Sequence, residues 1–264
     1  MRHHLSFICE GELLAATLDE APGTSGLLIV SGGNEIRCGA HRGMATLAQR
    51  IAAAGHPVFR FDRRGVGDSE GENGGFEASA PDIAAAIAAF RAAAPHMTRI
   101  TAFGNCDAAS ALLLHQPTGL DALVLANPWT YEPNADEEAS DEPALPPAAA
   151  IRARYLARLK DPQSLLRLLK GEIDLGKLWR GLSALGRSRP PQAPDSLAGR
   201  MNAALAALPC PATLLLAAGD RTAQAFLENC EIGAVPAERL DSASHSFAGP
   251  DGEWLAAQIL ARLQ

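Results

Sequence analysis

Residues 99–110 read R-I-T-A-F-G-N-C-D-A-A-S, and this stretch decides how the rest of the chain is interpreted. The apolar run 100–103 is typical of a buried strand, and a Gly-Asn pair ends it. An Ala- and Leu-rich segment over 107–115 then has the composition of a helix. Small residues stand two positions before and two positions after Cys106, where they let neighbouring backbone pass close to a strained turn. The stretch therefore predicts a strand that turns sharply into a helix, with Cys106 at the turn.

Strand-like and helix-like segments alternate on both sides of this turn. The predicted strands are an opening hairpin over 7–9 and 13–18, followed by 27–30, 57–61, 100–103, 122–125, 213–216 and 238–240. The predicted helices are 41–54, 79–94, 107–115, 222–229 and 251–263, and we expect Ser79 to cap the second of them. Such alternation predicts an α/β fold with a mainly parallel central sheet and helices on both of its faces.

Residues 127–209 interrupt the alternation, because they contain no convincing strand. The stretch 131–147 is acidic and Pro-rich, whereas 151–185 has a helical pattern. The segment 151–189 holds ten of the 23 Lys and Arg residues. We interpret this block as a helical cap inserted into the sheet domain. The predicted domains are 1–128 and 210–264 for the two parts of the sheet domain and 129–209 for the cap.

Composition and charge argue against several classes of protein. A net charge of −7 disfavours non-specific nucleic-acid binding, and no apolar run reaches the ~20 residues of a membrane span. The first residues lack the apolar region and cleavage site of a signal peptide. Five scattered Cys residues without a C-x-x-C pair are typical of reduced thiols. We therefore expect a cytoplasmic protein without disulfides, bound metal or cofactor.

Three residues have the chain order nucleophile, acid and base: Cys106, Asp220 and His245. Each follows a predicted strand, so a parallel sheet would bring all of them to one edge. A catalytic Cys needs a His as general base and an acid that orients this His, and a helix start favours the thiolate. Each residue also has a plainer interpretation. Cys106 fits an inert buried thiol, Asp220 a helix cap and His245 a surface-loop residue, and Glu132 is an alternative acid.

An oxyanion hole would need two backbone donors near the nucleophile. We expect the N–H of Asp107 to be one of them. The other would be the N–H of Gly33 or Asn34, in the loop after the strand 27–30. Two adjacent glycines in this loop let backbone approach a substrate closely, although they also fit an ordinary turn.

Together these features resemble the α/β-hydrolase superfamily and, more narrowly, the exosortase A system-associated hydrolase 1 group. The resembling motifs are G-G-N-E-I-R-C-G-A-H-R (32–42), F-R-F-D-R-R-G-V-G-D-S-E-G (59–71), F-G-N-C-D-A-A-S (103–110), N-P-W (127–129), Y-L-A-R-L (155–159), A-G-D-R-T-A-Q-A-F (218–226) and S-H-S-F (244–247). The resemblance implies an α/β-hydrolase fold with Cys, Asp and His at the three positions named above. It also implies a cytoplasmic bacterial protein associated with gene sets for exopolysaccharide and exosortase-dependent sorting. Asn34 and Ser244 depart from the Pro and Asp expected there.

The leading hypothesis is a Cys-dependent hydrolase or acyltransferase. It would act on an ester or thioester of a small-molecule or carrier-linked acyl substrate, and transfer to an acceptor other than water fits the same residues. The rival hypothesis is a non-catalytic hydrolase-fold binding module of the same system. The basic segment 151–189 either balances the acidic stretch before it or attracts an anionic acyl substrate. Nothing in the sequence selects an oligomeric state.

Overall fold

The structure is a computed structural model, and it describes residues 1–131 and 193–264. The strands are β1 (Arg2–Cys9), β2 (Glu12–Asp19), β3 (Ser25–Val30), β4 (Val58–Phe61), β5 (Arg99–Asn105), β6 (Ala122–Ala126), β7 (Ala212–Ala217) and β8 (Ala237–Leu240). The α-helices are α1 (Gly43–Ala53), α2 (Ala80–Ala93), α3 (Asp107–His115), α7 (Leu197–Ala206), α8 (Arg221–Asn229) and α9 (Asp251–Leu263). Two short 3₁₀ helices are η1 (Ala40–Arg42) and η2 (Phe76–Ala78).

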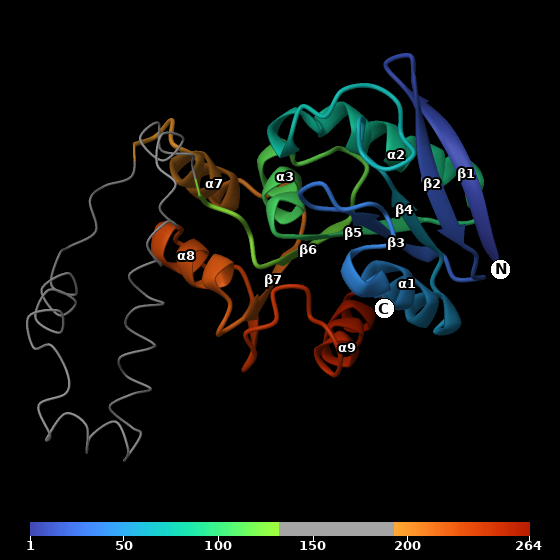
Figure 1. Ribbon diagram of the computed structural model, residues 1–264. Coiled ribbons are helices and arrows are strands. Elements are labelled where there is room, and N and C mark those ends of the chain that lie inside the picture. Colours follow the sequence, from blue (N-terminus) through green and yellow to red (C-terminus); the bar gives the residue numbers. More distant parts are fainter. Residues whose placement is uncertain (132–192) are drawn as a thin grey trace, which may run out of the picture.

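The strands of the described residues form one eight-stranded sheet in the order β1-β2-β4-β3-β5-β6-β7-β8 (Figure 1). The β1–β2 and β2–β4 pairs are antiparallel, and the pairs from β4 across to β8 are parallel. Every residue of the inner strands β3 and β6 is buried, as their continuous apolar sequences predict. The predicted α/β-hydrolase type of sheet, mostly parallel with an opening hairpin, is confirmed.

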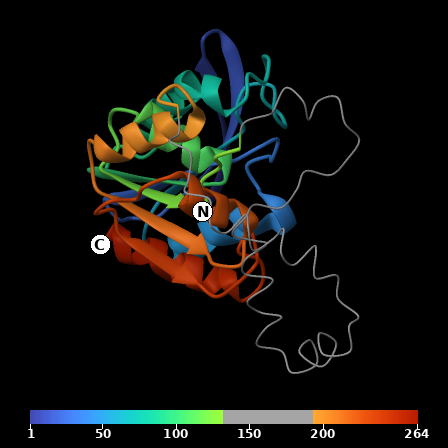
Figure 2. The ribbon, with the colours of Figure 1, turned by 90° about the vertical axis from the view of Figure 1, so that its left-hand side faces the viewer.

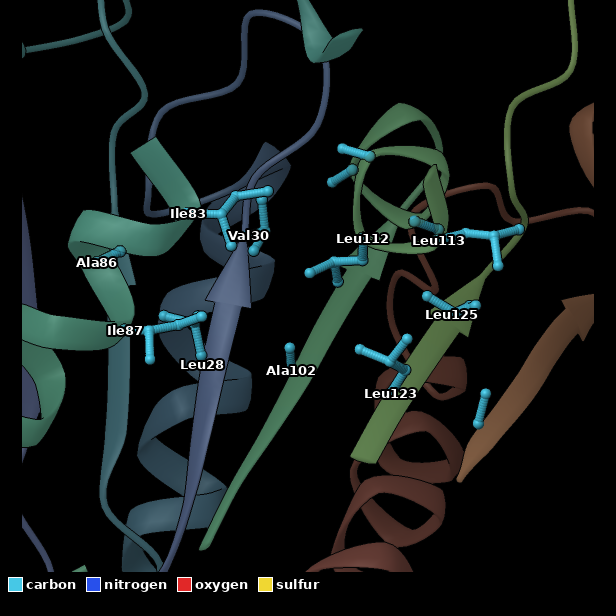
Figure 3. Packing of buried hydrophobic residues seen from close by; sticks show 14 of the residues in the cluster. Leu28, Val30, Ile83, Ala86, Ile87, Ala102, Leu112, Leu113, Leu123 and Leu125 are labelled. Atoms are coloured by element: carbon cyan, nitrogen blue, oxygen red, sulfur yellow. The ribbon is translucent and has the colours of Figure 1, made fainter. Parts of the chain in front are cut away.

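Helices cover both faces of the sheet (Figures 1 and 2). Alternate residues of β3 serve the two layers, because successive side chains of a strand point to opposite faces. Leu28 and Val30 lie in a buried cluster with residues of α2, α3, α7 and α8. Figure 3 shows both of them pointing toward the α2 side of the sheet, beside Ile83 and Ile87. The neighbouring β3 residue Ile29 lies in the second cluster, with residues of α1 and α9.

Helix α7 falls within the predicted cap of 129–209 but packs on the sheet domain. Its Leu197 and Met201 are buried in the same cluster as the α3 residue Leu112. Most of the predicted cap, including the basic segment 151–189, lies outside the described residues. The alternative acid Glu132 lies outside them as well. The cap and its boundaries therefore stay predictions.

The expected cap of helix α2 is wrong in its atomic detail. Ser79 precedes the helix, but its hydroxyl donates to the carbonyl of Phe76 at 2.6 Å and makes no capping bond. The reason is the backbone at Ser79, with φ −84° and ψ 1°, instead of the extended conformation that directs a side chain at the first amides of a helix. Helix η2 runs directly into this position and imposes that turn-like geometry.

Candidate active site

Cys106 stands at the turn between β5 and α3 with φ 61° and ψ −128°, a conformation that residues with a side chain rarely adopt. Close backbone packing holds the turn. A Cβ atom at Gly104 would lie 2.7 Å from the backbone carbon of Ala108, so only glycine fits the end of β5. Ala108 is itself fully buried. The small residues on both sides of Cys106 therefore match the strained strand-to-helix turn that the sequence predicts.

Asp220 and His245 are brought together from the carboxyl ends of β7 and β8. The Nδ1 atom of His245 donates to Oδ2 of Asp220 at 3.0 Å. The same carboxylate oxygen accepts from the backbone N–H of Ala223 at 3.1 Å, which makes Asp220 the N-cap of α8. Asp220 therefore makes the contact expected of a helix cap, and its bond to His245 is the contact that an orienting acid would make.

His245 also reaches the thiol at the turn. The pKa of His245 rises to about 10, first because of its hydrogen bond with Asp220 and second because of a hydrogen bond with Cys106. The charge of Asp220 raises it further, against the opposing effect of burial. The imidazole is therefore charged at neutral pH, and it lies next to a half-buried thiol. An imidazolium next to a reacting sulfur has a proton to give to a leaving group.

The predicted oxyanion loop lies beside Cys106, with a specific partner for one of its amides. The N–H of Gly33 donates to Oδ1 of Asp107, the residue after Cys106, at 2.6 Å. Gly33 has φ 55°, and a bond from the N–H of Glu35 to the carbonyl of Gly32 at 3.0 Å closes the turn that contains Asn34. As the first residue of α3, Asp107 has a backbone N–H without an acceptor inside the helix.

Two asparagines that the sequence patterns did not reveal hold the His245 loop. Asn127, at the end of β6, is fully buried and donates through Nδ2 to the backbone carbonyl of His245 at 3.2 Å. Asn105 donates to the same carbonyl at 3.1 Å. The Oδ1 atom of Asn127 accepts from the N–H of Ala217 at 2.9 Å, which ties β7 to the same group. The available signal was a polar residue directly after a buried strand, in the motif N-P-W.

An aromatic pair lies next to the catalytic candidates. The ring centroids of Trp129 and Tyr131 are 4.7 Å apart, and the hydroxyl of Tyr131 donates to the carbonyl of Arg221 at 3.1 Å. Trp129 is tied to the turn, because its backbone N–H donates to the carbonyl of Cys106 at 3.2 Å. Burial raises the pKa of Tyr131, and the negative charge of Asp220 raises it further.

Metal-binding clusters and membrane-spanning helices are both absent from the part of the chain that the structure describes. No three His, Cys, Asp or Glu side chains there are grouped so that they could hold a metal ion. None of the helices in those residues is both long and apolar enough to cross a membrane.

Comparison with known proteins gives one family and many similar folds. Residues 27–258 match the model of the Alpha/beta hydrolase family. An esterase from Pyrococcus furiosus has a TM-score of 0.63 at 15% identity, with 100% of this chain and 92% of that chain covered. A thioesterase domain from the curacin biosynthetic pathway has a TM-score of 0.58 at 15% identity, with 98% and 99% covered. A hydrolase from Pseudomonas aeruginosa has a TM-score of 0.56 at 21% identity, with 99% and 98% covered. Among curated proteins, none matches this sequence significantly.

Proposed function

Because the chain belongs to the alpha/beta hydrolase family, we propose that it is a Cys-dependent hydrolase that cleaves an ester or thioester. Cys106 is the nucleophile, His245 the general acid and base, and Asp220 the residue that orients His245. One observation carries this assignment. His245 donates to Asp220 at 3.0 Å, its pKa is raised by Asp220 and by Cys106, and the Cys106 thiol is held at a strained turn at the start of α3.

The first half of the reaction acylates the enzyme. The sulfur of Cys106 attacks the acyl carbon, a C–S bond forms, and the carbonyl oxygen takes the electron pair of its π bond. The N–H groups of Asp107 and of Gly33 or Asn34 stabilise this oxyanion. The bond to the leaving group then breaks, and His245 gives its proton to the departing oxygen or sulfur. The product of this half-reaction is a thioester on Cys106.

The second half releases the acyl group. Water attacks the thioester carbon, His245 removes the proton of the water, and the C–S bond breaks to free the acid. If an alcohol, amine or thiol replaces water, the same steps transfer the acyl group instead. Asp220 keeps the Nδ1 proton of His245 in place, so that the other ring nitrogen faces the reacting atoms.

The substrate class is supported by similar folds and by sequence motifs. The similar folds include a protein described as an esterase and another described as a thioesterase domain. The motifs that resemble the exosortase A system-associated group support an acyl substrate, small or carrier-linked, within an exosortase or exopolysaccharide system of the bacterial cytoplasm.

The test is alkylation of the folded protein with limiting iodoacetamide, followed by peptide mass spectrometry. We expect Cys106 to be labelled ahead of the other four thiols, because it has an imidazolium neighbour. Burial raises the pKa of Cys9 to about 11 and also raises that of Cys210, so both are slow internal references.

A second measurement addresses the chemistry. Intact-mass spectrometry after incubation with a panel of acyl thioesters and p-nitrophenyl esters should show one acyl adduct. Cys106→Ala should remove this adduct and the turnover, whereas Cys210→Ala should retain both. If Cys106 is labelled last, and no member of the panel acylates the protein, the non-catalytic binding module becomes the better description.

A further inference from the structure

The amide of Gly33, a predicted oxyanion donor, is occupied by a side chain of the protein itself. Its N–H donates to Oδ1 of Asp107 at 2.6 Å. A carboxylate accepts a stronger hydrogen bond than a neutral carbonyl oxygen does. A substrate carbonyl in its ground state therefore competes poorly with Asp107 for this donor.

A buried arginine holds the carboxylate in this place. The Nη2 atom of Arg63 lies 3.6 Å from Oδ2 of Asp107, and the same Nη2 donates to the carbonyl of Gly33. The side chain of Arg63 is only 4% exposed. Its Nη1 atom is buried without a hydrogen-bond partner among the described residues. A positive charge with an unused donor thus lies behind the carboxylate, and burying it is costly unless an anion stays near.

The backbone around Gly33 is shaped to receive the carboxylate. A Cβ atom at Gly32 would lie 2.5 Å from Oδ1 of Asp107 and 2.8 Å from the carbonyl oxygen of Asn105. Any residue larger than glycine would therefore push the Asp107 side chain away. The contact between the loop after β3 and the start of α3 depends on this fit.

We propose that the Asp107 carboxylate fills the oxyanion site of the resting protein and that the reacting acyl oxygen displaces it. The inference rests on the proposed function. When the sulfur of Cys106 adds to the carbonyl carbon, the oxygen becomes negative and takes over the Gly33 N–H. It then supplies the anion that Arg63 requires, and the carboxylate turns toward solvent. The exchange favours the transition state over the ground state, because only the charged oxygen replaces the carboxylate well.

The test uses an aliphatic aldehyde, hexanal, as a probe of the oxyanion site. The sulfur of Cys106 adds to the aldehyde carbon, and the thiol proton ends on the aldehyde oxygen or is lost from it, so the adduct is a reversible thiohemiacetal. Its affinity is measured by the protection of Cys106 against iodoacetamide, whose own reaction needs no oxyanion site. We expect Asp107→Ala to bind hexanal more tightly than the wild type by about tenfold or more, because Gly33 and Arg63 are freed for the adduct oxygen.

Asp107→Asn provides a second variant that keeps the shape of the side chain. The neutral amide still accepts from Gly33 but loses the charge attraction to Arg63, so its gain in hexanal affinity should lie between those of the wild type and Asp107→Ala. Asp68→Ala is the matched control, because it removes an exposed carboxylate that pairs with Arg37 at 3.1 Å. It should leave the affinity unchanged.

Three results would overturn the proposal. If Asp107→Ala and Asp107→Asn bind hexanal no more tightly than the wild type while Cys106 is still alkylated, Asp107 only braces the loop. An equal gain in hexanal affinity for Asp68→Ala would mean that the effect comes from the change in net charge and not from the oxyanion site. If Cys106 is not alkylated in any of these proteins, the proposed function fails first and this inference falls with it.

Discussion

At the scale of single residues, Asp220 shows why one side chain fits two interpretations. One carboxylate oxygen accepts from both His245 and the first turn of α8. The strand β7 ends three residues before Asp220 and the helix begins one residue after it, so the cap position and the edge of the sheet coincide. A helix cap needs only an oxygen acceptor, whereas a histidine that becomes charged gains from a carboxylate.

Replacing the carboxylate of Asp220 by an amide therefore separates its role as a helix cap from its role toward His245. Asp220→Asn keeps a good capping residue but loses the charge that holds the His245 proton, so the free energy of unfolding should fall near pH 7 and approach that of the wild type near pH 10. Turnover should fall by roughly 10⁴-fold, as it does when a triad loses control of its histidine tautomer. Steady-state kinetics and urea unfolding of the same preparation measure the two effects.

Ser196→Ala is the matched control for the cap. Ser196 accepts from the N–H of Gly199 at 3.1 Å at the start of α7, a helix that contains none of the three triad candidates. The Ser196→Ala variant should lose about 1 kcal/mol in the free energy of unfolding and keep the turnover of the wild type. Full activity of a folded Asp220→Asn protein would move the acid elsewhere, with Glu132 as the next candidate.

The raised pKa of His245 predicts a pH-dependent stability. The ordinary pKa of a histidine, 6.5, applies to the unfolded chain, whereas the pKa of His245 in the folded protein is about 10, so the folded state binds the proton more tightly. The resulting stabilisation is fully present below pH 6.5 and is lost as the pH rises through 10. We expect the urea midpoint of the wild type to exceed that of His245→Gln most at about pH 6 and to approach it near pH 10. If the difference in urea midpoint between the wild type and His245→Gln widened as the pH rises, the positive charge assigned to His245 would be wrong.

The three triad candidates could be predicted from sequence because each follows a strand whose apolar run is easy to recognise. The residues around them could not. Asn127 acts through the backbone of His245 and Ala217, and no local pattern reveals contacts between such distant segments. The bond between Gly33 and Asp107 is hidden for the same reason, since it joins a loop to the first residue of a helix 74 residues away.

At the scale of elements, the turn from β5 to α3 concentrates backbone strain in a few positions. Gly104→Ala would place a methyl group 2.7 Å from the backbone of Ala108, too close for backbone that cannot yield. We expect a loss of about 1–3 kcal/mol in the free energy of unfolding, together with slower alkylation of Cys106 as the turn shifts. Urea unfolding and timed iodoacetamide labelling measure the two changes.

Gly43→Ala is the control for removing a glycine. Gly43 begins α1 with φ −55° and ψ −50°, and a Cβ atom there would meet nothing within 4 Å. This change should stabilise the protein by about 0.4–1 kcal/mol, because alanine restricts the unfolded chain. If both variants gain stability, the packing of the turn is looser than the contact at Ala108 indicates.

Element ends show where sequence patterns stop being informative. The sequence pattern predicts the first strand over 7–9, but the strand runs from Arg2 to Cys9, because it pairs along its whole length with β2, with Arg2 opposite Asp19. Several of its side chains are exposed, so apolar periodicity cannot mark its start. The prediction that Ser79 caps α2 is wrong for a similar reason, because the turn before α2 sets the backbone angles of Ser79 and no sequence pattern marks this turn. For the buried strands, in contrast, the predicted ends lie within a few residues of the observed ends.

At the scale of the whole molecule, charge is distributed unevenly along the chain. The segment 151–189 holds ten basic and three acidic residues in a protein of net charge −7. The plain interpretation is a solvated basic segment that balances the acidic stretch 132–142. The alternative is a segment that attracts an anionic acyl substrate, such as an acyl group on a phosphopantetheine carrier. The two interpretations differ in how the reaction responds to salt.

Electrostatic attraction weakens as the Debye length shortens, from about 10 Å at 0.1 M salt to about 3 Å at 1 M. If the basic segment attracts the substrate, kcat/KM for an anionic acyl thioester should fall by about tenfold over this range. The value for a neutral p-nitrophenyl ester should hardly change. Charge reversal of Arg152, Arg154 and Arg158 to Glu should reproduce the selective loss at low salt.

The control for this prediction reverses three exposed arginines elsewhere, Arg91, Arg99 and Arg239, with the same change in net charge. Attraction by the whole molecule would lower kcat/KM for the anionic substrate equally in both triple variants, whereas local attraction would lower it only in the variant of the basic segment. The neutral ester reports damage to the triad in either protein. Equal salt dependence for the two substrates in the wild type would leave 151–189 as ordinary solvated charge.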